Sequence, residues 1–82
     1  MSAFEKAQAD VNTLSSRPGK DDLLFLYAHY KQASAGDATG KRPGMLDVTG
    51  RAKYDAWAKL QGLSQQDAEA KYIAKVNALL KA

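Results

Sequence analysis

The stretch Asp21–Gly36, DDLLFLYAHYKQASAG, decides how the chain folds. It predicts a helix over residues 22–35, with Asp21 as the N-cap and Gly36 as the left-handed residue that ends it. The α-helical repeat places aliphatic, phenolic and cationic side chains on one face of this helix. The residues of that face are Leu23, Leu26, Tyr27, Tyr30, Lys31 and Ser34, with Leu24 at its edge.

Before this stretch, the pattern predicts a helix over residues 3–15. Ser2 and Glu5 have the spacing of a capping box, and the apolar residues repeat on one helix face. That apolar face consists of Phe4, Ala7, Val11 and Leu14. The sequence SSRPGKDD, residues 15–22, then breaks the helix because its proline and glycine favour a turn.

After the stretch, two more helices are predicted. Thr49 is the expected N-cap of a helix over residues 50–61. Ser64 and Asp67 form a second capping box, which opens a last helix with its own apolar stripe. That stripe consists of Ala68, Tyr72, Val76 and Leu79. No segment has the alternation of a strand, so we expect an all-α fold of four helices with a long loop between the second and third.

The composition describes a single domain over residues 1–82. The chain has no cysteine, a formal charge of +3 and 45% hydrophobic residues, so its fold must be held by packing. The longest apolar run, Leu23–Ala28, is far shorter than the ~20 residues of a membrane span. The N-terminus lacks the apolar stretch of a secretory signal. We therefore expect a cytoplasmic protein without stable membrane insertion. Twelve basic residues against nine acidic ones favour an anionic partner, but not a nucleic acid.

The glycine-rich stretch Gly36–Asp47, GDATGKRPGMLD, has the residue types of a phosphate-binding loop but not its spacing. The gap after its first glycine is one residue short, an arginine follows the lysine where Ser or Thr is needed, and a helix precedes the loop where a strand is required. We expect a connector packed on the helices through Pro43, Met45 and Leu46. On this interpretation Gly44→Val lowers stability.

The tyrosines and lysine of residues 22–35 have two interpretations. Tyr27 and Tyr30 are either core residues with solvated hydroxyls, beside a Lys31 that extends to solvent, or a surface for a flat base and its phosphates. Trp57 lies one turn from Lys53 in the third predicted helix, and Tyr72 follows in the last. Together these residues favour a ligand that is aromatic, anionic and apolar.

Neither a catalytic nor a metal site is expected. His29 is the only histidine. It falls away from the tyrosine face and has no Ser, Cys or carboxylate partner at a recognisable spacing. We therefore expect a surface or boundary residue, and a protein that is not an enzyme. The acidic residues are scattered and form no metal cluster, and Asp47 is expected to be a loop or capping residue.

The runs LLFLYAHYKQASAGDATGKRPGMLD, Leu23–Asp47, and GRAKYDAWAKLQGLSQQDAEAKYI, Gly50–Ile73, closely resemble the acyl-CoA-binding protein family. The family pattern of Tyr-x-x-Tyr-Lys-Gln-Ala, Gly-Asp, Arg-Pro-Gly-Met-Leu-Asp and Ala-Lys-aromatic-Asp-Ala-Trp is present without gaps. The resemblance implies an up-down-down-up bundle of four helices. It also implies a non-catalytic carrier that binds medium- to long-chain fatty acyl-CoA esters, forms their pool and delivers them to acyl-CoA-using enzymes. We expect a monomer that needs no cofactor.

The resemblance also implies a head-group site. Carried over residue by residue, this site falls on Tyr27, Tyr30, Lys31, Lys53 and Tyr72, whose tyrosines frame the adenine and ribose while the lysines bind phosphates. We expect the acyl groove to be lined by Leu23, Leu24 and Tyr54. Two positions depart from the family: Asn12, where many members have a basic residue, and Tyr54, where many have tryptophan. The alternative function is a helical protein-interaction module without a small-molecule ligand.

Overall fold

The computed structural model describes residues 2–81, which form four α-helices and no strand. The helices are α1, Ala3–Val11; α2, Lys20–Ala35; α3, Val48–Ala58; and α4, Gln65–Lys81. The prediction of an all-α fold is confirmed.

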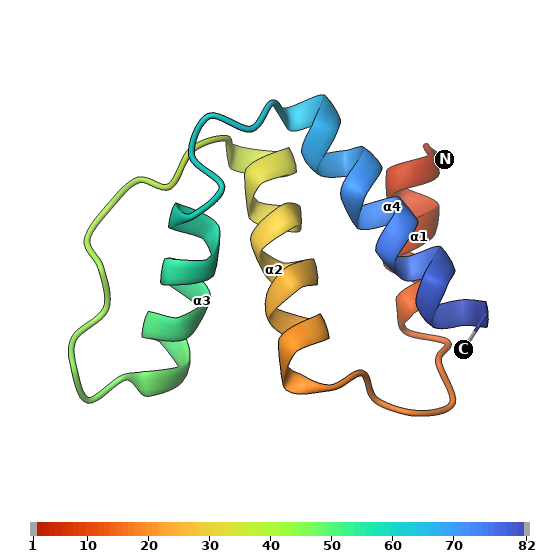
Figure 1. The fold of residues 1–82 in the computed structure, drawn as a ribbon, viewed down its shortest axis with the longest axis horizontal. Helices are drawn as coiled ribbons and strands as arrows, with labels where there is room; N and C mark the ends of the chain where they lie inside the picture. The colour runs from red at the N-terminus through yellow and green to blue at the C-terminus, as the bar shows by residue number, and fades with distance from the viewer. Residues whose placement is uncertain (1, 82) are drawn as a thin grey trace.

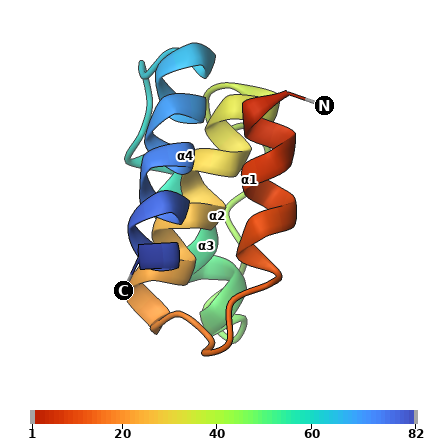
Figure 2. The same cartoon turned by 90° about the vertical axis from the view of Figure 1, so that its right-hand side faces the viewer.

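The helices form an up-down-down-up bundle (Figure 1). α2 lies at the centre and packs against α3 and α4, while α1 packs against α4. The loop of residues 36–47 carries the chain back along the bundle, so that α2 and α3 run in the same direction. The loop of residues 12–19 and the start of α3 therefore lie at the same end of the molecule, as Figure 2 also shows.

The helix ends are set by polar contacts that refine the predicted boundaries. The predicted capping box is present at α1, where Ser2 Oγ accepts from the Glu5 N–H and Glu5 Oε1 accepts from the Ser2 N–H, each at 3.1 Å. α1 ends at Val11, short of the predicted residue 15, because the Asn12 and Thr13 side chains donate to carbonyls of its last turn. The carbonyl groups of its final turn thus accept hydrogen bonds from these side chains, and the helix ends four residues before the predicted end.

The N-caps of α2 and α3 differ from the predicted ones. α2 begins at Lys20 with Gly19 as its N-cap, so Asp21 lies inside the first turn. α3 begins at Val48, and its N-cap is Asp47, which accepts the Gly50 N–H at 3.0 Å. The predicted capping role of Thr49 is wrong, because Asp47 occupies the position two residues earlier. The predicted cap of α4 is confirmed, since Ser64 Oγ accepts the Asp67 N–H at 3.0 Å.

The core lies where α1, α2 and α4 meet. Ala7, Leu26, Tyr72 and Val76 are its buried residues, and Phe4, Val11, Ile73 and Leu79 pack against them. All of these residues except Ile73 lie on the apolar faces that the helical repeat predicts. Burial of these side chains is the main source of stability in a domain of this size.

A hydrogen-bond network fastens the C-terminal end of α2, which lies at the top of Figure 1. Gln32 is fully buried, and its Nε2 donates to Asp37 Oδ1 and to the Leu63 carbonyl, both at 2.8 Å. Asp37 Oδ1 also accepts the Gly62 N–H at 2.9 Å. Trp57 Nε1 donates to the carbonyl of Gly36 at 2.8 Å. The network thus joins α2, α3 and both loops at this end.

The loop of residues 36–47 is not packed as predicted. Met45 is 77% exposed and Leu46 is 99% exposed, so these side chains contribute nothing to the core. Polar contacts hold the loop instead. Arg42 forms a two-pronged ion pair with Asp55 at 2.7 and 2.8 Å, and Arg51 Nε donates to the Pro43 carbonyl at 3.2 Å. Cationic forks can fix a loop backbone without any apolar anchor.

The predicted surface or boundary position of His29 is also wrong. His29 is 5% exposed and its ring stacks on Phe25 with centroids 4.0 Å apart. Its Nδ1 lies 2.7 Å from the Phe25 carbonyl oxygen. Because α2 is the central helix and is covered by both α3 and α4, the face opposite Tyr27 is buried as well.

Candidate functional site

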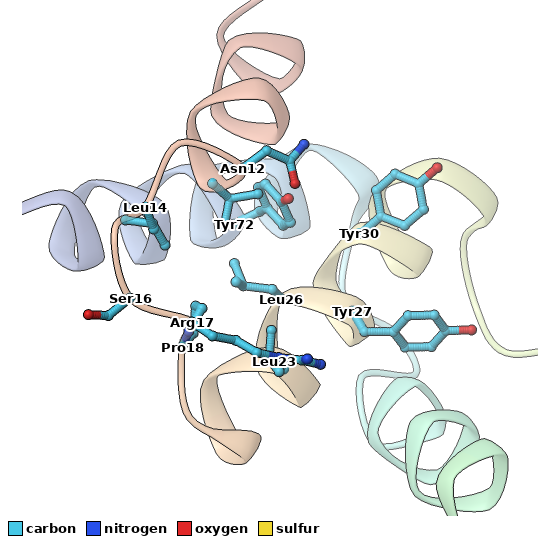
Figure 3. Close-up of a pocket in the computed structure, with 11 residues that line it drawn as sticks. Asn12, Leu14, Ser16, Arg17, Pro18, Leu23, Leu26, Tyr27, Tyr30 and Tyr72 are labelled. Atoms are coloured by element: carbon cyan, nitrogen blue, oxygen red, sulfur yellow. The ribbon is translucent and has the colours of Figure 1, made fainter.

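A cavity of about 400 Å³ lies between the loop of residues 12–19, α2 and α4 (Figure 3). Aliphatic side chains form one part of its wall, and tyrosines form another. The lining residues are Val11, Asn12, Leu14, Ser16, Arg17, Pro18, Leu23, Leu26, Tyr27, Tyr30 and Tyr72. A wall of this mixed kind suits a ligand with polar and apolar parts.

The tyrosine part of the wall is positioned by Phe4. The ring of Phe4 stacks on Tyr30 with centroids 6.2 Å apart, and meets Tyr72 edge-on at 5.2 Å. Tyr72 is 5% exposed, whereas Tyr30 is 39% exposed. Burial, and to a smaller degree the neighbouring Tyr30, raises the pKa of Tyr72. Its phenol therefore stays neutral and keeps its ability to donate a hydrogen bond.

Tyr27 and Tyr30 project from α2 in the same direction, and their hydroxyls point away from the aliphatic part of the cavity (Figure 3). This follows from their spacing of three residues, which places both rings on one helix face. The two rings offer flat surfaces beside each other.

Two lysines lie over aromatic rings next to this cavity. Lys53 Nζ, from α3, lies 5.4 Å from the ring centroid of Tyr27. Lys31 Nζ, from α2, lies 4.8 Å from the ring centroid of Trp57. In residues 2–81 neither ammonium group pairs with a carboxylate. The aromatic faces favour the cations without neutralising them, so both lysines are free to bind an anion.

A second cavity, also of about 400 Å³, adjoins the first between the N-terminal turns of α2 and α3. The two cavities share Arg17, Pro18 and Leu23. Leu24 adds a further aliphatic side chain, and the other lining residues are Lys20, Thr49 and Lys53. The wall of this cavity therefore combines apolar side chains with three cations.

The structure places the sequence-predicted residues around these cavities in three ways. Tyr27, Tyr30 and Tyr72 line the first cavity, and Lys53 lines the second. Lys31 is not among the lining residues, but lies one helical turn from Tyr27 and against Trp57. Among the predicted groove residues, Leu23 lines both cavities and Leu24 lines the second.

Tyr54 lines neither of the two cavities. Its hydroxyl donates to the Gly40 carbonyl at 3.1 Å, and its ring meets Trp57 edge-on at 6.1 Å. The tyrosine hydroxyl thus ties α3 to the loop of residues 36–47. Asn12, the other departure from the family pattern, does line the first cavity.

Sequence reasoning missed Arg17, which lines both cavities. The stretch around it was interpreted only as a helix break. A cation immediately before Pro18 and six residues before Leu23 was the available signal. It was not decisive, because the path of an irregular loop does not follow from a helical repeat.

Residues 2–81 hold no group of three or more His, Asp or Glu side chains placed to bind a metal ion. Over the same range, no helix is both long enough and apolar enough to cross a membrane.

The fold and the site together define an all-α domain with a cavity for an amphipathic, anionic ligand. The family model of the Acyl CoA binding protein matches residues 1–76. The chain belongs to the acyl-CoA-binding protein family.

Individual relatives agree with this assignment. An acyl-CoA-binding protein homolog from Manduca sexta is 55% identical over 78 residues, which cover 94% of this chain and 87% of the relative. The acyl-CoA-binding protein of Saccharomyces cerevisiae is 50% identical over 77 residues, covering 94% and 88%. The crystal structure of Oryza sativa Acyl-CoA-Binding Protein 2 superimposes with a TM-score of 0.92 at 40% identity, covering 96% of this chain and 86% of that one.

Proposed function

We propose that this protein binds medium- to long-chain fatty acyl-CoA esters in the cytoplasm, keeps them as a pool and carries them without chemical change. The observation that carries the proposal is the contact of two cavities, one with three tyrosines beside an aliphatic wall and one with leucines beside cations. An acyl-CoA ester likewise joins an aromatic, anionic head group to an apolar chain. Family membership supports the same ligand class.

We assign the head group to the tyrosine side. Tyr27, Tyr30 and Tyr72 frame the adenine and ribose, while Lys31 and Lys53 bind the phosphates. This assignment is supported by the two ammonium groups that lie over aromatic rings without carboxylate partners in residues 2–81. Each charge-assisted hydrogen bond to phosphate contributes about 1.5–3 kcal/mol.

We assign the acyl chain to the second cavity, where Leu23 and Leu24 supply the apolar wall. Burial of a methylene group contributes about 0.8 kcal/mol, so two further buried methylenes tighten binding by roughly tenfold. The gain ends when the cavity is full. Since the Tyr54 hydroxyl is hydrogen-bonded to the Gly40 carbonyl, we assign only Leu23 and Leu24 to the acyl site.

Isothermal titration calorimetry with palmitoyl-CoA, free CoA and palmitate tests the proposal. Palmitoyl-CoA is expected to bind far more tightly than either part, because only the ester occupies both cavities. Equal affinities for palmitoyl-CoA and free CoA would refute the carrier function. Chromatography of the ligand after incubation should recover the ester intact.

A matched pair of lysine variants tests the assigned residues. Lys31→Met keeps most of the side-chain stem but removes the charge, and is expected to weaken palmitoyl-CoA binding by about ten- to a hundredfold. Lys41→Met is the control, because Lys41 is an exposed lysine of the loop of residues 36–47 that is not assigned to the head-group site. Equal losses in the two variants would show a general effect of charge instead of a head-group contact.

A further inference from the structure

The turn before α3 and the first residue of α3 hold three apolar side chains in solvent. Met45 is 77% exposed, Leu46 is 99% exposed and Val48 is 73% exposed. We call these three residues the apolar tip. Its backbone is fixed, because the Asp47 N–H donates to the Gly44 carbonyl at 3.0 Å and the Asp47 carboxylate caps α3. A fixed cluster of this kind on a small protein marks a surface that contacts something apolar.

The shape of the apolar tip restricts its partner. A side chain that is 99% exposed, as Leu46 is, stands on a convex surface and has no groove around it. Met45, Leu46 and Val48 also line neither cavity of the site. A partner helix needs a groove for its apolar face. A fluid lipid surface needs none, because it deforms around inserted side chains.

The charges around the apolar tip favour an anionic surface. The loop of residues 12–19 and the start of α2, which carry Arg17 and Lys20, lie at the same end of the molecule as the start of α3 (Figures 1 and 2). Lys53 is exposed and shares the second cavity with both of them.

Of the carboxylates at this end, Asp22 forms an ion pair with Lys75 at 2.7 Å, Asp47 caps α3, and Asp21 is exposed in the first turn of α2. The three cations Arg17, Lys20 and Lys53 outnumber Asp21 and Asp47, the two carboxylates here without a cationic partner in residues 2–81. Cations next to exposed aliphatic side chains are the combination found in peripheral contacts with anionic membranes.

We propose that the apolar tip docks reversibly on an anionic phospholipid surface. Met45, Leu46 and Val48 enter the lipid headgroup region, while Arg17 and Lys20 contact the lipid phosphates. Val48 directly precedes Thr49, which lines the second cavity. Docking therefore brings the proposed acyl site to the membrane, where an acyl chain can pass between lipid and protein. That consequence rests on the proposed function, whereas docking itself does not.

Flotation with ligand-free vesicles tests the docking. The chain should bind vesicles of phosphatidylcholine mixed with phosphatidylserine, and much less to phosphatidylcholine alone. Raising the salt concentration should release it, because surface charge interactions are screened. Leu46→Gln is expected to lower the bound-to-free ratio by about tenfold, since it removes an inserted aliphatic group. Leu63→Gln is the control, because Leu63 is a leucine of the loop between α3 and α4, which lies at the opposite end of the molecule in Figure 1.

A fluorescent probe gives an independent measurement. The chain has no cysteine, so Leu46→Cys and Gln66→Cys can each carry one environment-sensitive dye. The dye at position 46 should shift to the emission of an apolar medium when anionic vesicles are added, and the dye at position 66, on the first turn of α4, should not.

Three results would overturn the proposal. These are vesicle binding unchanged by Leu46→Gln, equal binding to both vesicle types, and a wild-type dimer that Leu46→Gln converts to a monomer without vesicles. The vesicles contain no acyl-CoA, so failure here leaves the palmitoyl-CoA titration as a separate test of the carrier function.

Discussion

The two ends of α2 use their polar groups in opposite ways. At the C-terminal end, Gln32 and Asp37 form hydrogen bonds with backbone groups and with each other. At the N-terminal end, Gly19 caps the helix without any side-chain hydrogen bond, and Arg17 and Lys20 line an open cavity. We call these the closed end and the open end. Internal hydrogen bonds hold the first end, whereas cations of the second end lie beside a cavity.

The difference between the two ends is visible in two consecutive residues of α2. Gln32 is fully buried and joins the network of the closed end, whereas Lys31 is half-buried and places its ammonium over Trp57. The same indole donates its N–H to Gly36 within the network. The closed end therefore positions the surface on which the proposed phosphate-binding lysine rests. Rigid support of this kind lowers the cost of ordering a binding side chain.

The largest effect is expected from Gln32→Glu, which changes a buried donor into a carboxylate facing Asp37. The substitution preserves shape but places two acidic groups together and leaves a buried charge without a partner. We expect a loss of about 3–5 kcal/mol in the free energy of unfolding, measured by urea denaturation at neutral pH. That is a large share of the stability of a small domain.

Gln61→Glu is the control for this substitution, because Gln61 is exposed near the same end. Its stability should stay within about 0.5 kcal/mol of wild type. Similar losses in the two variants would mean that the buried network does not hold the closed end.

A smaller loss of stability is expected when the pH is lowered, because Asp37 then becomes protonated. The Gly62 backbone N–H, followed by the Gln32 side chain, lowers the pKa of Asp37 below its ordinary value of 3.8. Since the folded-state pKa is the lower one, the unfolded chain takes up the proton first as the pH falls. The contribution of Asp37 to stability is therefore complete above about pH 4, and is lost as the pH falls through the folded-state pKa.

Urea midpoints measured from about pH 5 to about pH 3 check this expectation. Asp37→Asn should be less stable than wild type at neutral pH, and its midpoint should fall less over this range. Asp55, whose pKa is lowered by the hydrogen bond from Arg42, is intact in both proteins and gives the same background loss. Parallel curves for the two proteins would contradict a role for Asp37 at the closed end.

The helices and their apolar faces could be predicted from the sequence because both depend on local spacing. Phe4, Leu26, Tyr72 and Val76 lie on predicted stripes, and they meet in the core. The tyrosines of α2 share a face for the same reason, so their grouping at one cavity required no knowledge of the fold.

What escaped prediction depends on the packing of whole helices and on loop paths. His29 is buried because α2 has neighbours on two sides, which a single helical wheel does not represent. Arg17 reaches both cavities through the course of an irregular loop. Met45 and Leu46 are exposed because Arg42 and Arg51 already hold the loop. Apolar side chains on a surface are common enough that residue type alone does not predict burial.

The smallest change in stability is expected from Gly44→Val. This substitution distinguishes a loop packed through apolar side chains from a loop held by polar contacts. A packed loop predicts a loss of stability, but a Cβ added at Gly44 meets no atom within 4 Å. Gly44 is also not among the glycines with positive φ, so a β-branched residue can adopt its backbone conformation. We therefore expect a change of less than about 0.5 kcal/mol in urea denaturation.

Gly36→Val is the matched comparison, since Gly36 has a φ of 83° and a ψ of −152° at the closed end. Residues other than glycine rarely adopt that backbone conformation. The strain in Gly36→Val is therefore expected to lower the free energy of unfolding by about 1–3 kcal/mol. The same substitution thus has unequal effects at the two ends of one loop. If Gly44→Val lowered stability as much as Gly36→Val, the turn that follows Pro43 would contribute to the stability of the fold. Its apolar side chains would then not be free to insert into a membrane.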